Sequence, residues 1–226
     1  MQCNSLFNQN NSFNLGKEAL IASGINDDFQ LNHYMNKLNK LYDIFIQEGS
    51  ASHNDLTKAK ELFNWLWAKK PLRYKRNGEY KLHNVVDAQT SEHNREVGNC
   101  LGLTLLYNCL AKKTGIVIES LYLEHAFENG PHVLSIIEIE NSQIDVENIL
   151  SKGFDYKEHA NNSTRTRWGD KELVAEIYNS MGNELFEKGE LNLALEYYNK
   201  SIKMNPSHEL AQLNKIILLD KMSMGN

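Results

Sequence analysis

The 226-residue chain carries 24 basic and 29 acidic residues, a net charge of -5 and a hydrophobic content of 41%. These values are ordinary for a globular protein, and the length fits one domain of about 150–170 residues with a small appendage. The acidic balance excludes the basic footprint of a nucleic-acid-binding protein. No apolar run reaches the roughly 18–20 residues of a membrane span, so we expect no membrane partner and a cytoplasmic location.

Helical spacing of apolar residues dominates the first part of the chain. Residues 1–14 are rich in asparagine and are expected to form a flexible leader. The pattern from 17 to 48 predicts at least one long amphipathic helix. A second predicted helix begins at the capping pair Asn54-Asp55 and ends before Pro71. Residues 72–98 are polar and rich in turn residues.

A third predicted helix follows, and after it the spacing of apolar residues changes from that of a helix to that of a strand. Asn99 is a suitable N-cap for this helix, and Gly115 is a suitable terminator. Segments of strand character come next: Ile116–Leu123, His132–Glu140 and Gln143–Leu150. Asn141-Ser142 is the expected tight turn between the last two. Helices, a small antiparallel sheet and further helices, in that order, predict an α+β fold for the first domain.

Cys100 is the leading candidate for a catalytic nucleophile. It directly follows the expected N-cap, so its sulfur lies at the positive end of a helix, which favours the thiolate. The N–H groups there can hold an oxyanion, and Gly98 leaves room for a substrate backbone. The alternative for Cys100 is an inert buried residue, which is the expected state of Cys109. Cys3 lies in the leader, without supporting context.

A thiolate nucleophile needs a base and an acid group that orients this base. His132 opens a predicted strand, and Asp145 lies on the same face of the return strand. A strict two-residue turn would place Asp145 opposite Glu138, whereas Glu147 lies on the same face and closer to His132. Asp145 therefore ranks first as the orienting acid and Glu147 second, with His125 as the competing base.

The segment around Cys100 resembles the transglutaminase-like superfamily. Members show a Gly-x-Cys helix, a Gly-Ile turn, a His-led strand and an aspartate, and here 98–116, 130–133 and 144–146 fill these positions. The resemblance covers roughly residues 62–150. It implies a papain-like core with Cys100 as nucleophile, His132 as base and Asp145 as orienter. The interval between His132 and Asp145 is shorter than in the pattern.

The carboxy-terminal segment resembles a tetratricopeptide repeat. Residues at the positions of the 34-residue pattern include Tyr178, Gly182, Ala194, Tyr198, Ser201 and Pro206. Its small residues would let two antiparallel helices pack closely. One repeat with a capping helix is fewer than the about three repeats usually needed for stability, so we expect docking on the first domain or on a partner.

The resulting organisation is a leader (1–14), a transglutaminase-like domain (15–160), a linker (161–170) and a tetratricopeptide repeat with a capping helix (171–226). The leading hypothesis is a cofactor-free thiol enzyme that hydrolyses peptide or isopeptide bonds of a protein or peptide substrate. The alternative is a non-catalytic module whose repeat binds a protein partner. A metal hydrolase ranks third, because His125 and His132 lack the usual helical pair spacing.

Overall fold

The computed structural model describes residues 13–49, 54–127, 130–139 and 142–224. Within these ranges, five helices precede a four-stranded sheet and three helices follow it. The helices are α1 (Leu15–Ala22), α2 (Asp28–Gly49), α3 (Asp55–Lys69), α4 (Leu82–Thr90), α5 (Cys100–Lys113), α6 (Asp170–Glu187), α7 (Leu191–Met204) and α8 (Glu209–Met224). The strands are β1 (Ile118–Leu123), β2 (His132–Ile139), β3 (Ser142–Val146) and β4 (Arg165–Trp168). None of the helices in these ranges is long and apolar enough to cross a membrane.

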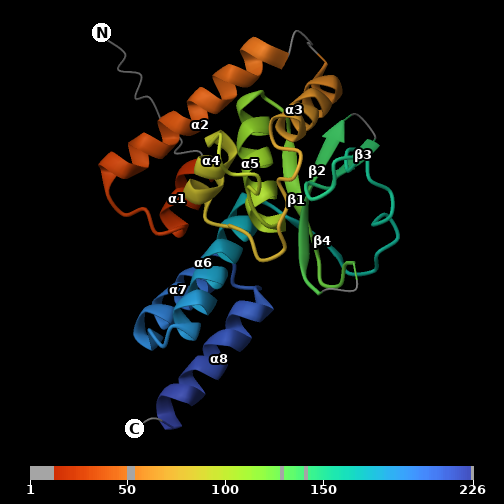
Figure 1. Cartoon of the computed structure of the whole chain (residues 1–226). Coiled ribbons are helices and arrows are strands. Elements are labelled where there is room, and N and C mark those ends of the chain that lie inside the picture. The colour runs from red at the N-terminus through yellow and green to blue at the C-terminus, as the bar shows by residue number, and fades with distance from the viewer. Residues whose placement is uncertain (1–12, 50–53, 128–129, 140–141, 225–226) are drawn as a thin grey trace, which may run out of the picture.

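Helix α5 is the central element of the first part. Every residue from Leu101 to Ala111 is buried, because α5 packs against β1 and β2 and contacts each of α1 to α4 (Figure 1). Asn99 caps its start, as the sequence predicts, and its side-chain oxygen accepts a hydrogen bond from the N–H of Gly102 at 3.1 Å. A local cap and a buried helix thus fix where Cys100 lies.

The sheet is antiparallel, with strand order β3-β2-β1-β4. Leu123 pairs with His132 at one end of β1 and β2. Between β2 and β3, Asp145 pairs with Ile136, whereas the strict turn placed it opposite Glu138. Ser142 already belongs to β3 and pairs with Ile139, so the expected turn at Asn141-Ser142 is wrong. Asp145 therefore pairs with a residue two positions earlier in β2 than the strict turn would give. Asn141 itself lies outside the described residues.

Helix α6 connects the carboxy-terminal helices to the first part of the molecule. Its apolar residues Leu173, Val174, Ile177 and Tyr178 belong to the main hydrophobic core. It contacts α1, β1 and β4, while α7 packs on α6 and α8 on α7 (Figure 1). The repeat therefore docks on the first domain through its first helix.

The pattern from 17 to 48, which predicts at least one long helix, covers α1 and the long helix α2, with Gly24 at a φ of 96° between them. Two other parts of the sequence interpretation differ from the structure. The turn-rich stretch 72–98 contains α4, and the expected linker 161–170 contains β4, which pairs with β1. Most of the expected leader lies outside the described residues, but Asn14 caps α1.

Candidate functional site

Cys100 is the first residue of α5, and its side chain is partly exposed. The segment before α4 runs across this helix end, where Tyr74 forms a parallel bridge with Gly98. Among the described residues, no hydrogen bond uses the N–H groups of Cys100 and Leu101. The thiol therefore lies at a helix start that retains backbone donors. Cys109 is buried in the same helix, as the sequence predicts.

Two glycines near Cys100 serve packing of the chain. A Cβ atom at Gly98 would lie 2.6 Å from the carbonyl oxygen of Glu79, and one at Gly102 would lie 2.4 Å from the same atom. The N–H of Asn99 donates to that oxygen at 3.0 Å. The space at Gly98 is thus filled by the chain itself, and the expectation that it admits a substrate backbone is wrong.

His132 begins β2 and is almost fully buried between a thiol and a carboxylate. Its Nε2 lies 2.8 Å from Oε2 of Glu147, and Cys100 lies close enough to affect the pKa of its ring. Burial lowers the pKa of His132, but the bonds to Cys100 and Glu147 outweigh burial and raise it to about 10.

Glu147 follows directly after β3 and is fully buried. The loop from Glu147 to Gly153 closes on itself and holds the Glu147 backbone, since its N–H donates to the carbonyl of Gly153 at 2.8 Å. Its Oε1 accepts from the N–H of Ile149 at 3.3 Å, while Oε2 faces His132. Burial alone would raise the pKa of this carboxyl, but the hydrogen bonds from His132 and His159 lower it below its usual value.

Asp145 does not contact His132. Its carboxylate forms a two-pronged ion pair with Arg165, with Nη1 at 2.7 Å and Nη2 at 3.1 Å. Arg165 also donates to the backbone oxygen of His159 at 2.8 Å. The expectation that Asp145 orients His132 is therefore corrected: the shifted strand register gives this contact to Glu147, the second-ranked acid.

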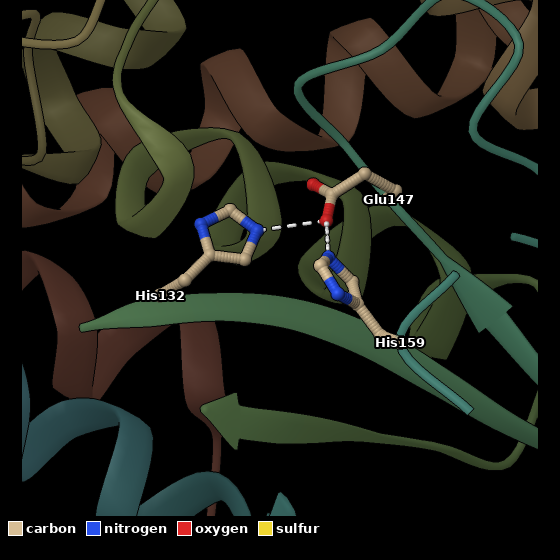
Figure 2. A group of neighbouring side chains, drawn as sticks. All are labelled: His132, Glu147 and His159. Carbon is tan, nitrogen blue, oxygen red and sulfur yellow. Dashed lines mark hydrogen bonds and ion pairs between the residues drawn. The ribbon is translucent and has the colours of Figure 1, made fainter. Parts of the chain in front are cut away.

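His159 joins the same carboxylate from a different segment. Figure 2 shows its ring below Glu147, with Nε2 at 3.2 Å from Oε2. The ring of Phe127 lies edge-on against both histidines, with centroid distances of 5.3 Å to His132 and 4.7 Å to His159. The one ligand atom offered by each of His132, Glu147 and His159 lies within 4.8 Å of the others, which is close enough to share a metal ion.

The sequence analysis did not single out His159, because it lies in a polar stretch without a regular pattern. His125, the competing base, has a side chain that is 76% exposed, and its nearest ionic partner is Glu124 at 3.9 Å. The structure thus brings together Cys100, His132 and Glu147, adds His159, and leaves His125 at the surface.

Buried polar side chains fix α5 against the sheet beneath the site. Ser135 donates to the side-chain oxygen of Asn108 at 2.6 Å, and Asn148 donates to Ser135 at 2.9 Å. Thr104 donates to the backbone oxygen of Val133, the neighbour of His132, at 3.2 Å. These bonds hold the helix that carries Cys100 to the strand that carries His132.

Comparisons with known proteins identify the carboxy-terminal segment. Residues 175–208 match the tetratricopeptide repeat family. An uncharacterized protein of Methanocaldococcus jannaschii is 44% identical over 45 residues, which is 20% of this chain and 52% of that protein. The match thus spans about half the length of that relative. No solved structure matches significantly.

These findings define an α+β protein that carries a tetratricopeptide repeat, and the repeat supports a role in protein interaction.

Proposed function

We propose that the protein is a thiol-dependent acyl-transfer enzyme on a transglutaminase-like scaffold, acting on peptide or isopeptide bonds. The contact of His132 with both Cys100 and Glu147 is the observation that carries this proposal. A nucleophile, a base and an orienting acid in one chain of contacts are the requirements of acyl transfer through a thiol. In this assignment Cys100 is the nucleophile, His132 the base and Glu147 the orienter.

The reaction follows from these positions. Cys100 gives its thiol proton to His132 and its sulfur attacks the amide carbonyl, while the N–H groups of Cys100 and Leu101 stabilise the oxyanion. When the carbon–nitrogen bond breaks, His132 donates its proton to the leaving amine and a thioester remains on Cys100. Water then attacks the thioester while His132 takes its proton, which releases the acid and restores the thiol. Glu147 stabilises the imidazolium during both steps.

A simple activated ester tests the assignment. The protein is incubated with the p-nitrophenyl ester of N-acetylglycine, and nitrophenol release is followed together with the intact mass. We expect an acetylglycyl adduct on Cys100 and a rate reduced about 100-fold or more in His132→Gln. Cys100→Ala should form no adduct, and Cys109→Ala is the matched control with an unchanged rate. Equal rates in the wild type and His132→Gln would overturn the proposal.

A non-catalytic protein-binding module is the second candidate, and the tetratricopeptide match favours it. Helix α8 also exposes apolar side chains, among them Leu213, Ile216 and Ile217. In this case the repeat binds a protein while Cys100 has no chemical role. The ester experiment separates the two candidates, because a binding module predicts no adduct that depends on His132.

A further inference from the structure

His159 is a buried histidine that the proposed acyl transfer does not use. It reaches Glu147 from the loop between β3 and β4, a segment held in place by the Arg165 bond to its backbone oxygen. The ring of Tyr156 packs edge-on against it at 5.0 Å and lies 6.3 Å from the ring of Phe127, which also contacts His159. A histidine fixed so firmly at a carboxylate that already has a partner calls for a separate explanation.

The three polar atoms are arranged compactly around one point. Oε2 of Glu147 lies 2.8 Å from Nε2 of His132 and 3.2 Å from Nε2 of His159 (Figure 2). A tetrahedral zinc ion with bonds of about 2.0–2.2 Å separates its ligand atoms by about 3.3–3.5 Å. The two separations from Glu147 are therefore shorter than this spacing by roughly half an ångström or less, and all three ligand atoms lie within 4.8 Å of one another.

The donor set is chemically suited to zinc. Two imidazoles and one carboxylate are a common ligand set for this ion, and an open fourth position remains for water. The outer contacts also fit, since ligand groups usually carry a second hydrogen bond that fixes them. Glu147 has the N–H of Ile149 on its other oxygen, and His132 has Cys100 beside its ring.

The cluster lies just below the surface. The side chains of His132, Glu147 and His159 are 6%, 0% and 7% exposed. Phe127, whose ring covers both imidazoles, is itself 37% exposed.

We propose that His132, Glu147 and His159 form a zinc site whose occupation switches off Cys100. The inhibitory consequence rests on the proposed function, whereas zinc binding itself does not. Zinc on Nε2 of His132 fixes the ring proton on Nδ1, so the ring can no longer accept a proton from the thiol. It also removes Glu147 from its position as the orienting acid.

Zinc binding is measured first in Cys100→Ala, so that the thiol contributes nothing. The chelator-treated protein is titrated with zinc in competition with a chromophoric chelator. We expect one ion per chain, and a dissociation constant at least about 10-fold higher in the additional variant His159→Gln. His125→Gln, at an exposed histidine, is the matched control and should bind zinc unchanged. Equal affinity with and without His159 would overturn the site.

Cobalt gives a second readout that needs no substitution at the three proposed ligands. Cobalt(II) added to the Cys100→Ala protein should give the intense visible absorption of a four-coordinate site. A weak, octahedral spectrum identical to that of cobalt in buffer would contradict the proposal.

The switch is tested by alkylation of Cys100 with iodoacetamide in the otherwise unchanged protein. One equivalent of zinc should slow the reaction about 10-fold or more, and His159→Gln should relieve this inhibition. Alkylation that ignores bound zinc would overturn the switch. Zinc binding without an ester adduct on Cys100 would remove the acyl-transfer function and leave the metal site. An ester adduct on Cys100, together with zinc binding that does not depend on His159, would remove the metal site and leave the acyl-transfer function.

Discussion

At the scale of single residues, the site depends on one buried negative charge. Glu147 is fully removed from solvent, and a buried carboxylate is strongly unfavourable unless hydrogen bonds and opposite charge compensate for it. Two imidazole N–H groups and one backbone N–H supply this compensation. The same bonds fix the ring of His132 beside Cys100, so packing and chemistry rest on the same contacts.

Replacing Glu147 tests this dependence. We expect Glu147→Gln to slow ester-driven acylation of Cys100 about 10- to 100-fold, because the amide neither stabilises the imidazolium nor fixes its tautomer. Asp145→Asn is the matched control. It should leave acylation nearly unchanged but lower the free energy of unfolding by roughly 3 kcal/mol, since it breaks the pair with Arg165. Slow acylation in Asp145→Asn with a nearly unchanged rate in Glu147→Gln would show that Asp145 is the functional acid.

Some of these residues could be predicted because neighbouring residues in the sequence determine their local structure. Asn99 and the apolar run behind it place Cys100 at a helix start without reference to the rest of the chain. The choice between Asp145 and Glu147 depended on strand register, in which Ile139 pairs with Ser142 and Ile136 with Asp145. His159 depended on the fold of a whole loop, which the bond from the N–H of Tyr156 to the oxygen of Asp145 helps to close. No periodic pattern of residues in the sequence indicates such contacts.

At the scale of elements, the contact between α6 and α7 is the closest in the repeat. Gly182 faces the ring of Tyr198, and Ser201 donates to the backbone oxygen of Ala175 at 2.8 Å. Tyr198 also donates to the side chain of Asn183 at 2.8 Å. The small residues predicted from the repeat pattern thus allow the two helices to approach each other.

Gly182→Ala should destabilise the protein although alanine favours helices. A Cβ atom at this position would lie 2.5 Å from the Tyr198 ring, so the helices must move apart. We expect a loss of about 1–3 kcal/mol in the free energy of unfolding, measured by urea denaturation. Glu187→Ala, on the exposed end of the same helix, is the control and should change little. A stabilised Gly182→Ala protein would mean that the close approach does not exist.

Glu184 links α6 to the segment that precedes α4. It accepts from Tyr80 at 2.8 Å and pairs with Lys81 at 2.7 Å. Burial opposes ionisation, but bonds from Lys188, Lys81 and Tyr80 outweigh it and lower the pKa of Glu184 to about 2. Because its folded pKa is lowered, its stabilisation is full above the unfolded value and is lost as pH falls towards about 2.

Glu184→Gln should therefore lower the free energy of unfolding by about 1–2 kcal/mol at pH 7, once solvent screening of this partly exposed group is considered. The difference from the wild type should shrink between about pH 4.5 and pH 2. Urea denaturation at a series of pH values measures it. A difference that stays constant over this range would exclude the carboxylate as its source.

The elements that the sequence did not predict are short and depend on their neighbours. Helix α4 has nine residues, and Lys81 at its N-cap makes no side-chain capping bond. Burial of Leu82, Val85 and Val86 stabilises it instead. Strand β4 has four residues, two of them exposed, and exists through its pairing with β1. Tertiary contacts rather than local preference determine both elements.

At the scale of the whole molecule, the repeat and the first domain share one hydrophobic core. The apolar face of α6 lies in that core, and Lys112 of α5 pairs with Asp170 at the start of α6 at 3.1 Å. The repeat therefore brings any bound protein near the domain that contains Cys100, while its own first helix stays fixed.

The carboxy-terminal helices should not fold alone. A fragment of residues 171–226 loses the partner surface of α6, and one repeat with one further helix buries too little apolar area. We expect weak helical circular dichroism and no cooperative melting transition. A strongly helical fragment with a sharp transition would show that the shared core is not needed.

The most direct test of the account compares the thiols of Cys100 and Cys109 in the native protein. Burial raises the pKa of the Cys109 thiol to about 12, so it should resist iodoacetamide, whereas Cys100 lies at a helix start in contact with His132. Peptide mass spectrometry in the presence of a chelator should find Cys100 alkylated about 100-fold faster, and His132→Gln should remove about 10-fold of this advantage. Equal rates at the two cysteines, or a Cys100 rate unchanged by His132→Gln, would contradict a Cys100 thiol activated by His132.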